Sequence, residues 1–559
     1  MSQADLLGAS LLDVQPAAFA RLTERLLWHL GFENVYNIDG PGDGGADLVG
    51  RRRGERWVFQ VKSTQRAPVS ADAVEELLRG TQIFNADRGA LVTNREFTRG
   101  AKDRIHTLND VTQSPNRLQL WNRNTLLQLA GKPDFPERFG HPELRPYQVD
   151  AFQALWADLK HSESALMVLA TGLGKTVVAG AVIERFLSEH PGSKILVLAH
   201  RIALVDQLEK ALWKHIPKHV PTQQLSGQEH PHDLEGITAA TIQSAITYVR
   251  EGFRPDFIFI DEAHHVGEGS EYAEMLELCP DALRLGATAT PLRGDAFDIT
   301  EIFGEPLDGA QVTIEEGMKL GYLADVDYRL LADNVDWLFV QQASENNYSL
   351  GELNRKLFLP QQLEGVRDEL LGVWQNTISP KGIVFCQSVQ HAERMLEALQ
   401  GVPDWTNAAT IHNELHDREK KTRLAKFRLG DIPLLIAVDI LNEGVDVPDV
   451  NIICFSRVTH SRRIFVQQLG RGLRLNERTG KTKVTVLDFV SDLRRAKAAL
   501  DLRSQVCGET EDVYLPSSHS ITFSDQGVES LIKEWLYDEV ADFENASDDV
   551  LLKLPPFSR

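Results

Sequence analysis

Residues 165–176, ALMVLATGLGKT, decide the fold class of this chain. An apolar run at 165–169 leads into a glycine-containing loop at 171–176, and a helical pattern follows from 177 to 187. Near-continuous apolar runs are typical of strands buried on both faces of a parallel sheet. A glycine loop between such a strand and a helix lets backbone N–H groups and the helix N-terminus face a phosphate. The stretch therefore predicts a parallel α/β domain with a nucleotide site.

The chemistry of this loop indicates ATP with Mg²⁺. Lys175 would reach the β- and γ-phosphates, and the Thr176 hydroxyl would be a ligand of the metal ion. The loop departs from the pattern G-x-x-x-x-G-K-[ST], because Leu169 occupies its first glycine position. Taken alone, the loop is also compatible with a simple helix-capping turn. The residues expected to bind the nucleotide here are Thr171, Gly172, Gly174, Lys175 and Thr176.

A second apolar strand supplies the carboxylates that ATP hydrolysis needs. Residues 257–260, FIFI, run directly into Asp261-Glu262-Ala263-His264. Asp261 would hold Mg²⁺ through water, and Glu262 would orient and deprotonate the attacking water. A third apolar stretch ends in the sequence GATATP at 286–291. The glycine loop and the paired carboxylates together favour an ATP hydrolase over a capping turn.

The order of these three motifs resembles that of the superfamily 2 helicases and translocases. The resemblance implies two tandem RecA-like parallel-sheet domains, and the apolar runs do fall into two sets, at 165–286 and 382–487. In the second set, QQLGRGLR at 467–474 is similar to the family's motif VI. This similarity implies that Arg471 and Arg474 are arginine fingers, which stabilise charge on the transferring phosphate from across a cleft. Gln467 belongs to the same motif.

Two further segments are similar to nucleotide-contacting motifs of the family. Residues 439–448 resemble motif V, which implies roles in the nucleotide site for Gly444 and Asp446. The sequence LRPYQ at 144–148 resembles the adenine-reading motif, with Arg145 and Gln148 at the base. All of these motifs fall in the family's order, so the resemblance covers roughly 140–495 of the chain.

Other motifs of the family imply contacts with a nucleic-acid strand. Residues 199–201, AHR, resemble motif Ia, and residues 241–244, TIQS, resemble motif Ic. The resemblance implies that Arg201, Thr241 and Gln243 contact the phosphates of the tracked strand, which positions the strand without reading its sequence. For Arg201 a surface salt bridge is the alternative. The TATPLRGD string and the L-x-x-Y-Q start look more like DNA motors related to restriction-enzyme translocases, so the expected partner is double-stranded DNA, tracked on one strand.

The N-terminal region carries a separate cluster of polar residues. Asp47 follows a glycine-rich loop and enters one strand, and RWVFQVK at 56–62 forms the next. Side chains alternate between faces along a strand, so Gln60 and Lys62 share one face while Phe59 lies on the other. Because the two strands are neighbours, we expect Asp47 to meet Gln60 and Lys62.

This constellation resembles the PD-(D/E)xK nucleases, specifically the Mrr-type restriction endonuclease-like domain, over roughly 10–130. Gln60 stands where the second acid is usual, and GALVTNREFTRGA at 89–101 is similar to a later strand and helix of that domain. The resemblance implies that Asp47 and Gln60 bind Mg²⁺ and that Lys62 orients the nucleophile or stabilises charge on the phosphorane.

One departure bears on nuclease activity. The family often has Phe-Glu in the first helix, where the acid supports the metal, whereas this chain has Phe19-Ala20. Glu24 lies four residues later on the same helical face and could take its place. With few negative ligands, an inactive domain that only binds DNA stays open as the alternative.

Composition and spacing define the remaining organisation. We expect domains at 1–135, 141–308 and 309–500, because a connector dense in Gly and Pro lies at 131–142. A final acidic segment, 501–559, holds 13 acidic and 4 basic side chains and is a candidate protein-binding surface. The four cysteines lie far apart, which disfavours a zinc ribbon.

The overall charge excludes some classes of protein. The net charge of −21 excludes a histone-like or polybasic coat protein, although a local basic groove could still bind nucleic acid. The sequence has no apolar run of about 18 residues and no signal-peptide pattern, so we expect no membrane span and a cytoplasmic location.

The lead hypothesis is an ATP-dependent DNA helicase or translocase fused to a Mg²⁺-dependent endodeoxyribonuclease, acting in restriction or antiviral defence against foreign DNA. Two alternatives stay open. One is a repair or fork-processing helicase whose nuclease-like domain is inactive and only binds DNA. The other is an ATP-switched binding scaffold that recruits partners through its acidic segment.

Overall fold

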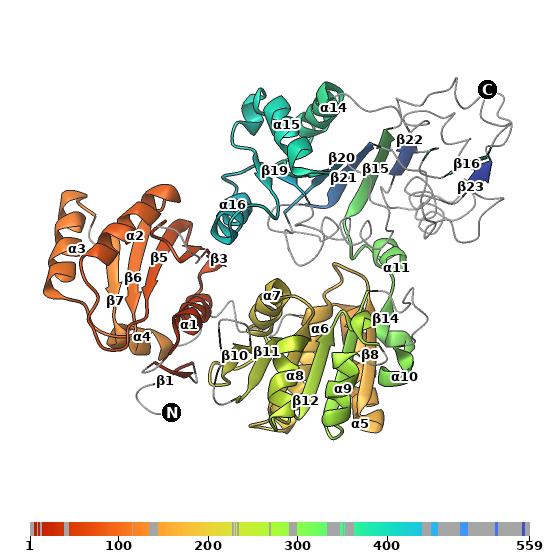
Figure 1. Cartoon of the computed structure of the whole chain (residues 1–559), viewed down its shortest axis with the longest axis horizontal. Coiled ribbons are helices and arrows are strands. Elements are labelled where there is room, and N and C mark those ends of the chain that lie inside the picture. The colour runs from red at the N-terminus through yellow and green to blue at the C-terminus, as the bar shows by residue number, and fades with distance from the viewer. Residues whose placement is uncertain are drawn as a thin grey trace. The chain divides into compact units, whose positions relative to one another are not determined.

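The structure is a computed structural model, and it divides the chain into two compact units. The first unit holds residues 1–170, 174–312 and 417–426, and the second holds 171–173, 313–416 and 427–559. The described residues form three larger sheets, of five, seven and seven strands (Figure 1). The residues that the structure describes are 5–7, 9–11, 14–38, 44–114, 116–132, 143–225, 229, 231, 234–267, 270–289, 299–331, 347–349, 352, 363–438, 449–456, 481–489, 520–523 and 551–553.

The N-terminal sheet has five strands in chain order, and it changes from antiparallel to parallel pairing at β5. Its strands are β3 (Glu33–Asn37), β4 (Leu48–Arg52), β5 (Glu55–Lys62), β6 (Arg88–Thr93) and β7 (Leu118–Trp121). Four helices accompany it: α1 (Pro16–His29), α2 (Asp72–Ile83), α3 (Arg99–Val111) and α4 (Arg123–Ala130). Helices α1 and α4 contribute to the aromatic core on one face, whereas α2 packs on the other side of β5 and β6.

The alternation predicted for β5 is confirmed. Trp57 and Phe59 are buried in the core cluster that includes residues of α1. Lys62 contacts a residue of α2 instead, on the opposite face. The period of two therefore sends Trp57 and Phe59 to one face and Lys62 to the other.

The second sheet is entirely parallel, as the near-continuous apolar runs predicted, and its strand order is β10-β11-β9-β12-β13-β8-β14. The strands are β8 (Ser164–Leu169), β9 (Ile195–Ala199), β10 (Thr222–Leu225), β11 (Ile237–Thr241), β12 (Phe257–Asp261), β13 (Leu283–Thr288) and β14 (Gln311–Val312). Its main helices are α5 (Pro146–Ser162), α6 (Lys175–Glu189), α7 (Ile202–Leu212), α8 (Ile242–Arg250) and α9 (Glu271–Leu278). All carboxyl ends of parallel strands meet at one edge, which is where such folds bind ligands.

The third sheet is also parallel, in the order β18-β19-β17-β20-β21-β15-β22. Its strands are β15 (Asp325–Leu331), β17 (Gly382–Cys386), β18 (Ala409–Ile411), β19 (Leu434–Ala437), β20 (Ile452–Ser456), β21 (Lys483–Phe489) and β22 (Ser520–Phe523). Helices α14 (Leu363–Gln375) and α15 (Val389–Gln400) add buried side chains to its core. Strand β22 lies within the acidic segment, so part of that segment is an edge strand of this sheet.

Among the described residues, no helix is both long and apolar enough to cross a membrane. Three cysteines of the described part, Cys279, Cys386 and Cys454, are buried and form no disulfide bond.

Candidate active sites

The glycine loop after β8 has the backbone geometry of a phosphate-binding turn. Gly172 and Gly174 have φ of 94° and 84°, in the left-handed region that side chains with a Cβ rarely adopt. Gly174 is the N-cap of α6, and Lys175 is the first residue of that helix. The Val177 N–H already donates to the Gly174 carbonyl oxygen at 2.9 Å, whereas the N–H groups before it, at the start of α6, are available to an anion.

The second motif lies at the end of β12 and contains a strained residue. Asp261 ends the strand, and Glu262 follows with φ 53° and ψ 51°. Such a conformation costs a non-glycine residue about 1–3 kcal/mol, and residues held in it cluster at functional sites. The Lys175 Nζ lies 3.7 Å from Glu262 Oε1. The lysine of the loop and the expected general base are thus brought together.

A histidine connects this motif to the next strand. His264 Nδ1 lies 3.3 Å from Glu262 Oε2 and 3.0 Å from the hydroxyl of Thr288, the last residue of β13. His264 and Thr288 are both buried, which strengthens a hydrogen bond between them. The predicted motif around Thr288 is therefore linked to the carboxylates, whereas residues 290–298 lie outside the described residues.

Asp261 has the properties of a Mg²⁺ ligand. Burial, together with the adjacent Glu262 charge, raises the pKa of Asp261 to about 6. Its Oδ1 is buried and has no hydrogen-bond partner among the described residues. Such an oxygen is costly unless a cation is present, and Mg²⁺ prefers oxygen ligands. With the half-buried Thr176 at the start of α6, the site therefore fits the ion.

The adenine-motif residues lie at the start of α5. The Arg145 N–H donates to Gln148 Oε1 at 3.0 Å, which caps the helix. A Cβ placed on Gly174 would lie 2.7 Å from Gln148 Nε2, so the Gln148 side chain rests against the glycine loop. The structure thus brings Gln148 to the predicted nucleotide site.

The predicted strand-contact residues follow β9 and β11, at the same edge of the sheet. Arg201 and Gln243 are exposed, whereas Thr241 is 7% exposed, with its hydroxyl 3.1 Å from that of Ser244. Sequence reasoning missed His200 and His265, whose ring centroids lie 4.4 Å apart. The His265 ring is also 4.4 Å from that of His264, so these rings join the motif Ia region to the carboxylates.

Five predicted residues lie outside the described residues: Gln467, Arg471, Arg474, Gly444 and Asp446. Their roles stay predictions.

The N-terminal cluster assembles on the α2 side of β5. The Val61 N–H donates to Asp47 Oδ2 at 2.6 Å, which holds the Asp47 carboxylate beside the strand that carries Gln60 and Lys62. Gln60 is 4% exposed, and its Oε1 has no hydrogen-bond partner among the described residues. Asp47, directly before β4, therefore lies beside the strand β5 that carries Gln60 and Lys62.

Glu76 is a further site residue, which sequence reasoning missed. Its Oε2 lies 2.5 Å from Lys62 Nζ. Gly45, two residues before Asp47, has φ 64°, and a Cβ there would lie 1.8 Å from the Glu76 carbonyl oxygen. The loop that carries Asp47 thus packs directly against helix α2. Glu76 has no spacing signature in the sequence, because it reaches the site from a helix packed on the sheet.

The donor set of this cluster fits Mg²⁺ through oxygen atoms. Asp47 offers a carboxylate, and the buried Gln60 Oε1 offers a carbonyl oxygen that accepts no hydrogen bond from the described residues. Within the described part of the chain, no group of three or more His, Cys, Asp or Glu residues could hold a metal ion. The amide of Gln60 therefore has to contribute if the ion binds here.

Glu24, the suggested substitute for the missing helix acid, is engaged elsewhere. Its Oε1 lies 2.8 Å from the Nζ of Lys210, on helix α7. The Lys210 ammonium is shared with Asp206, at 2.7 Å. The hypothesis that Glu24 supports the metal is therefore wrong for this structure, because the polar face of α1 points away from β5.

Because Glu24 is buried, we expect it to make the free energy of unfolding depend on pH. Burial raises the pKa of Glu24 from 4.5 to about 7, although Lys210 opposes the change. The folded chain then holds more protons than the unfolded chain between these two values. Its free energy of unfolding should fall as the pH rises through this window, by up to about 3 kcal/mol. Denaturation of wild type and Glu24→Gln at pH 5 and pH 7.5 checks this: the wild type should lose more stability than the variant, and equal losses would contradict it.

Three family models match this chain in succession. Residues 11–130 match the model described as "Restriction endonuclease". Residues 141–293 match "Type III restriction enzyme, res subunit", and residues 361–476 match "Helicase conserved C-terminal domain".

Whole-chain comparison finds restriction enzymes and DNA motors. The chain is 27% identical to the Type I restriction enzyme EcoKI endonuclease subunit of Escherichia coli K12, over 68% of this chain and 38% of that protein. It is 29% identical to the EcoAI endonuclease subunit of Escherichia coli, over 66% and 49% respectively. It is 26% identical to the DNA 3'-5' translocase XPB2 of Sulfurisphaera tokodaii, over 64% and 84%. The chain thus spans less than half the length of the two restriction enzymes it matches.

These matches coincide with the three sheets and with the motifs described above. The chain therefore joins an N-terminal domain similar to the Mrr-type restriction endonucleases to two RecA-like domains similar to those of helicases and of restriction-enzyme subunits.

Proposed function

We propose that this chain is an ATP-driven DNA translocase that carries its own Mg²⁺-dependent endonuclease and acts in restriction of foreign DNA. The observation that carries the proposal is the presence of two separately assembled sites. One site pairs Lys175 with Glu262, and the other gathers Lys62 and Glu76 beside the strand that holds Asp47. The cytoplasm, where ATP and incoming DNA are both present, is the proposed place of action.

In the motor site, the chain's own residues position ATP and its attacking water. Lys175 and the N–H groups at the start of α6 would bind the phosphates, and Glu262 would accept a proton from the water. Mg²⁺, bound through Asp261 and Thr176, would neutralise charge on the β- and γ-phosphates. Because His264 contacts both Glu262 and Thr288, it would couple a change in the charge of Glu262 to the end of β13. Arg471 and Arg474 would stabilise the charge of the transferring phosphate.

In the nuclease site, the expected reaction is hydrolysis of a phosphodiester bond. Water attacks phosphorus, one P–O bond forms, and the bond to the leaving sugar oxygen breaks. Lys62 would orient the water or stabilise the extra negative charge on phosphorus, and Asp47 with Gln60 would hold Mg²⁺, which polarises the phosphate. Glu76 would hold the Lys62 ammonium in place through the 2.5 Å contact.

A DNA clamp without cleavage activity is the second candidate function. It is favoured by Gln60 in place of an acid and by the engagement of Glu24 with Lys210. Plasmid DNA incubated with Mg²⁺, with and without ATP, and resolved on a gel separates the two. Nicks or breaks support the nuclease, whereas intact DNA beside strong DNA-stimulated ATP hydrolysis supports the clamp.

Glu76→Gln tests the newly found site residue. Removing the carboxylate frees the Lys62 ammonium, so we expect plasmid cleavage to slow by about 10- to 100-fold, as for other residues that orient a catalytic group. DNA-stimulated ATP hydrolysis should be unchanged.

The neighbouring Glu75 is the matched control for this substitution. Glu75 lies on the same helix as Glu76 but pairs with Arg104 of α3, at 2.6 Å, so Glu75→Gln should leave cleavage at the wild-type rate. Equal rates for the Glu75 and Glu76 variants would remove Glu76 from the site.

A further inference from the structure

Helix α1 is buried on two opposite faces, and each face contacts a different domain of the first compact unit. Phe19, Leu22 and Leu26 are at most 3% exposed and pack in the nuclease core. On the other side of the helix, Arg21 and Arg25 are 6% and 1% exposed, although their long side chains are charged. Charged residues are almost never buried to this degree unless they are paired.

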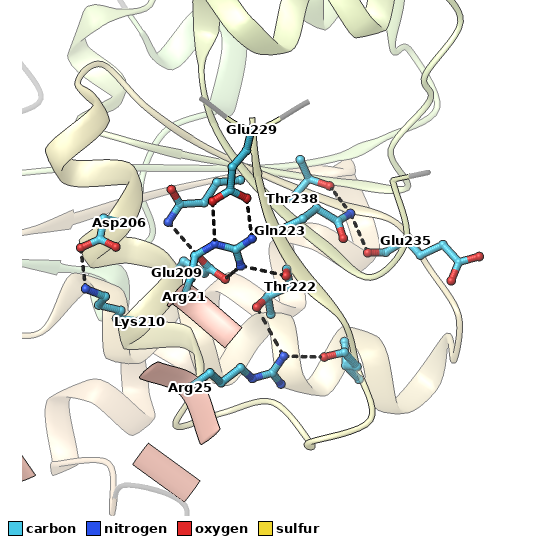
Figure 2. Close-up of polar contacts among 12 residues, drawn as sticks. Arg21, Arg25, Asp206, Glu209, Lys210, Thr222, Gln223, Glu229, Glu235 and Thr238 are labelled. Carbon is cyan, nitrogen blue, oxygen red and sulfur yellow. Dashed lines mark hydrogen bonds and ion pairs between the residues drawn. The ribbon is translucent and has the colours of Figure 1, made fainter. Parts of the chain in front are cut away.

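The partner of Arg21 is a pair of carboxylates on the first motor domain (Figure 2). Its guanidinium contacts both carboxylate oxygens of Glu229, at 3.3 Å and 2.6 Å. It also donates to Glu209 Oε1 at 2.9 Å and to the Thr222 carbonyl oxygen at 3.1 Å. Glu209 is fully buried and receives a further hydrogen bond from Gln224, at 2.8 Å. The Arg21 guanidinium thus donates hydrogen bonds to two carboxylates and one carbonyl oxygen.

Two more charged residues extend this contact along α1. Arg25 donates to the carbonyl oxygens of Val220, at 3.0 Å, and Pro217, at 3.3 Å, in the segment that leads into β10. Glu24 contacts Lys210 of α7, as described above. The contact surface therefore combines the polar face of α1 with α7 and the region around β10 (Figure 2).

The energetics of this surface favour a specific fit over a loose one. Separation of the two domains would return Arg21 to water. Removal of only one member of an ion pair, with the domains still in contact, would instead leave the opposite charge buried without compensation. Loss of one member of a buried pair costs several kcal/mol, whereas removal of both members often costs little. The surface therefore strongly favours the position of α1 in which Arg21 meets Glu209 and Glu229 over any position in which these charges are not paired.

We propose that α1 is a docking helix, which fixes the nuclease domain on the α7 and β10 surface of the first motor domain. The nuclease domain then moves with that motor domain as one body and does not swing on a flexible connector. The proposal depends on neither ATP hydrolysis nor DNA cleavage, so it can fail or hold independently of the proposed function.

A cleavable form of the full chain tests the docking. A recognition sequence for a site-specific protease is inserted between residues 132 and 143, in the connector rich in Gly and Pro. The folded, purified protein is cut, and the two fragments are run on a size-exclusion column. We expect the wild-type fragments to elute together, and their separation would overturn the proposal.

The substitution Arg21→Met tests whether the ion pairs of Arg21 hold the two fragments together. Leaving the carboxylates of Glu209 and Glu229 buried without the Arg21 charge should weaken binding between the cut fragments by at least about 100-fold, so that they separate. Arg99→Met is the matched control, because Arg99 is exposed on α3 and its side chain is 95% accessible. Its fragments should stay together. Joint elution of the Arg21→Met fragments would overturn the proposal.

A rescue variant separates docking from general misfolding. The triple substitution Arg21→Met, Glu209→Gln and Glu229→Gln removes all three charges, so its fragments should bind more tightly than those of Arg21→Met. If Arg21→Met does not fold, Lys210→Met replaces it, since the Lys210 side chain is 24% exposed and contacts Glu24 across the same surface. Fragments of Lys210→Met that bind as tightly as wild type would then contradict the proposal.

Discussion

Replacing Glu262 by Gln should lower DNA-stimulated ATP hydrolysis by about 10³-fold, as expected for loss of a general base. Glu262 is held in a left-handed conformation at the end of β12, with Lys175 Nζ 3.7 Å from its Oε1. Gln keeps the shape of the side chain but cannot accept the proton of the attacking water. Binding of ATP should therefore persist while turnover is lost. Steady-state hydrolysis and equilibrium binding of a fluorescent ATP analogue measure the two effects.

The exposed Glu277 of α9 is the control for that substitution. It lies in the same domain but away from the carboxyl ends of the parallel strands, where Glu262 lies. Glu277→Gln should hydrolyse ATP at the wild-type rate. A Glu262→Gln protein that retained more than about a tenth of the activity would exclude Glu262 as the general base, since such groups contribute at least about 10²-fold.

The second large effect is expected from Lys62→Ala, which should reduce plasmid cleavage by about 10²- to 10³-fold. Lys62 is the cation of the N-terminal site, at 2.5 Å from Glu76 and beside the backbone N–H that holds Asp47. Without its ammonium group the cluster loses this cation, whereas Arg56, the other basic residue of β5, donates to the Phe84 carbonyl oxygen at 2.6 Å. ATP hydrolysis should be unchanged, because the motor site shares no side chain with this cluster. A gel assay of supercoiled plasmid, run beside an ATPase assay, measures both.

Lys102→Ala removes an exposed lysine from α3 of the same domain and serves as the control. If Lys62→Ala and Lys102→Ala cleave DNA equally well, the cluster is not the nuclease site and any cleavage arises elsewhere. If neither protein nor the wild type cleaves DNA while all hydrolyse ATP, the clamp function is supported instead.

The predicted parts of the fold are those with a strong local pattern. Apolar runs such as 165–169 and 257–260 became parallel strands β8 and β12, because such runs are stable only when both faces are covered. The site residues follow from the same logic. Asp261 and the glycine loop stand at the carboxyl ends of parallel strands, so knowing the strands already brings them to one edge.

The missed residues reach their sites from elements without a sequence signature. Glu76 comes from a helix that packs on β5, and only that packing brings it to Lys62. The acidic composition of residues 501–559 likewise carries no sign that Ser520–Phe523 pairs with β15, because β-pairing depends on the partner strand.

The sequence by itself determined the parallel sheets, the glycine loop after β8 and the placement of Asp47 beside Gln60 and Lys62, because each depends on a short pattern within one strand–loop unit. Only the tertiary structure decided the use of the polar face of α1. Its residues are amphipathic and predict a helix with one face in water, yet Arg21 bonds to Glu209 and Glu229, which are 188 and 208 positions away. Periodicity specifies that a face is polar, but the partner that covers it is chosen by complementary charge across domains.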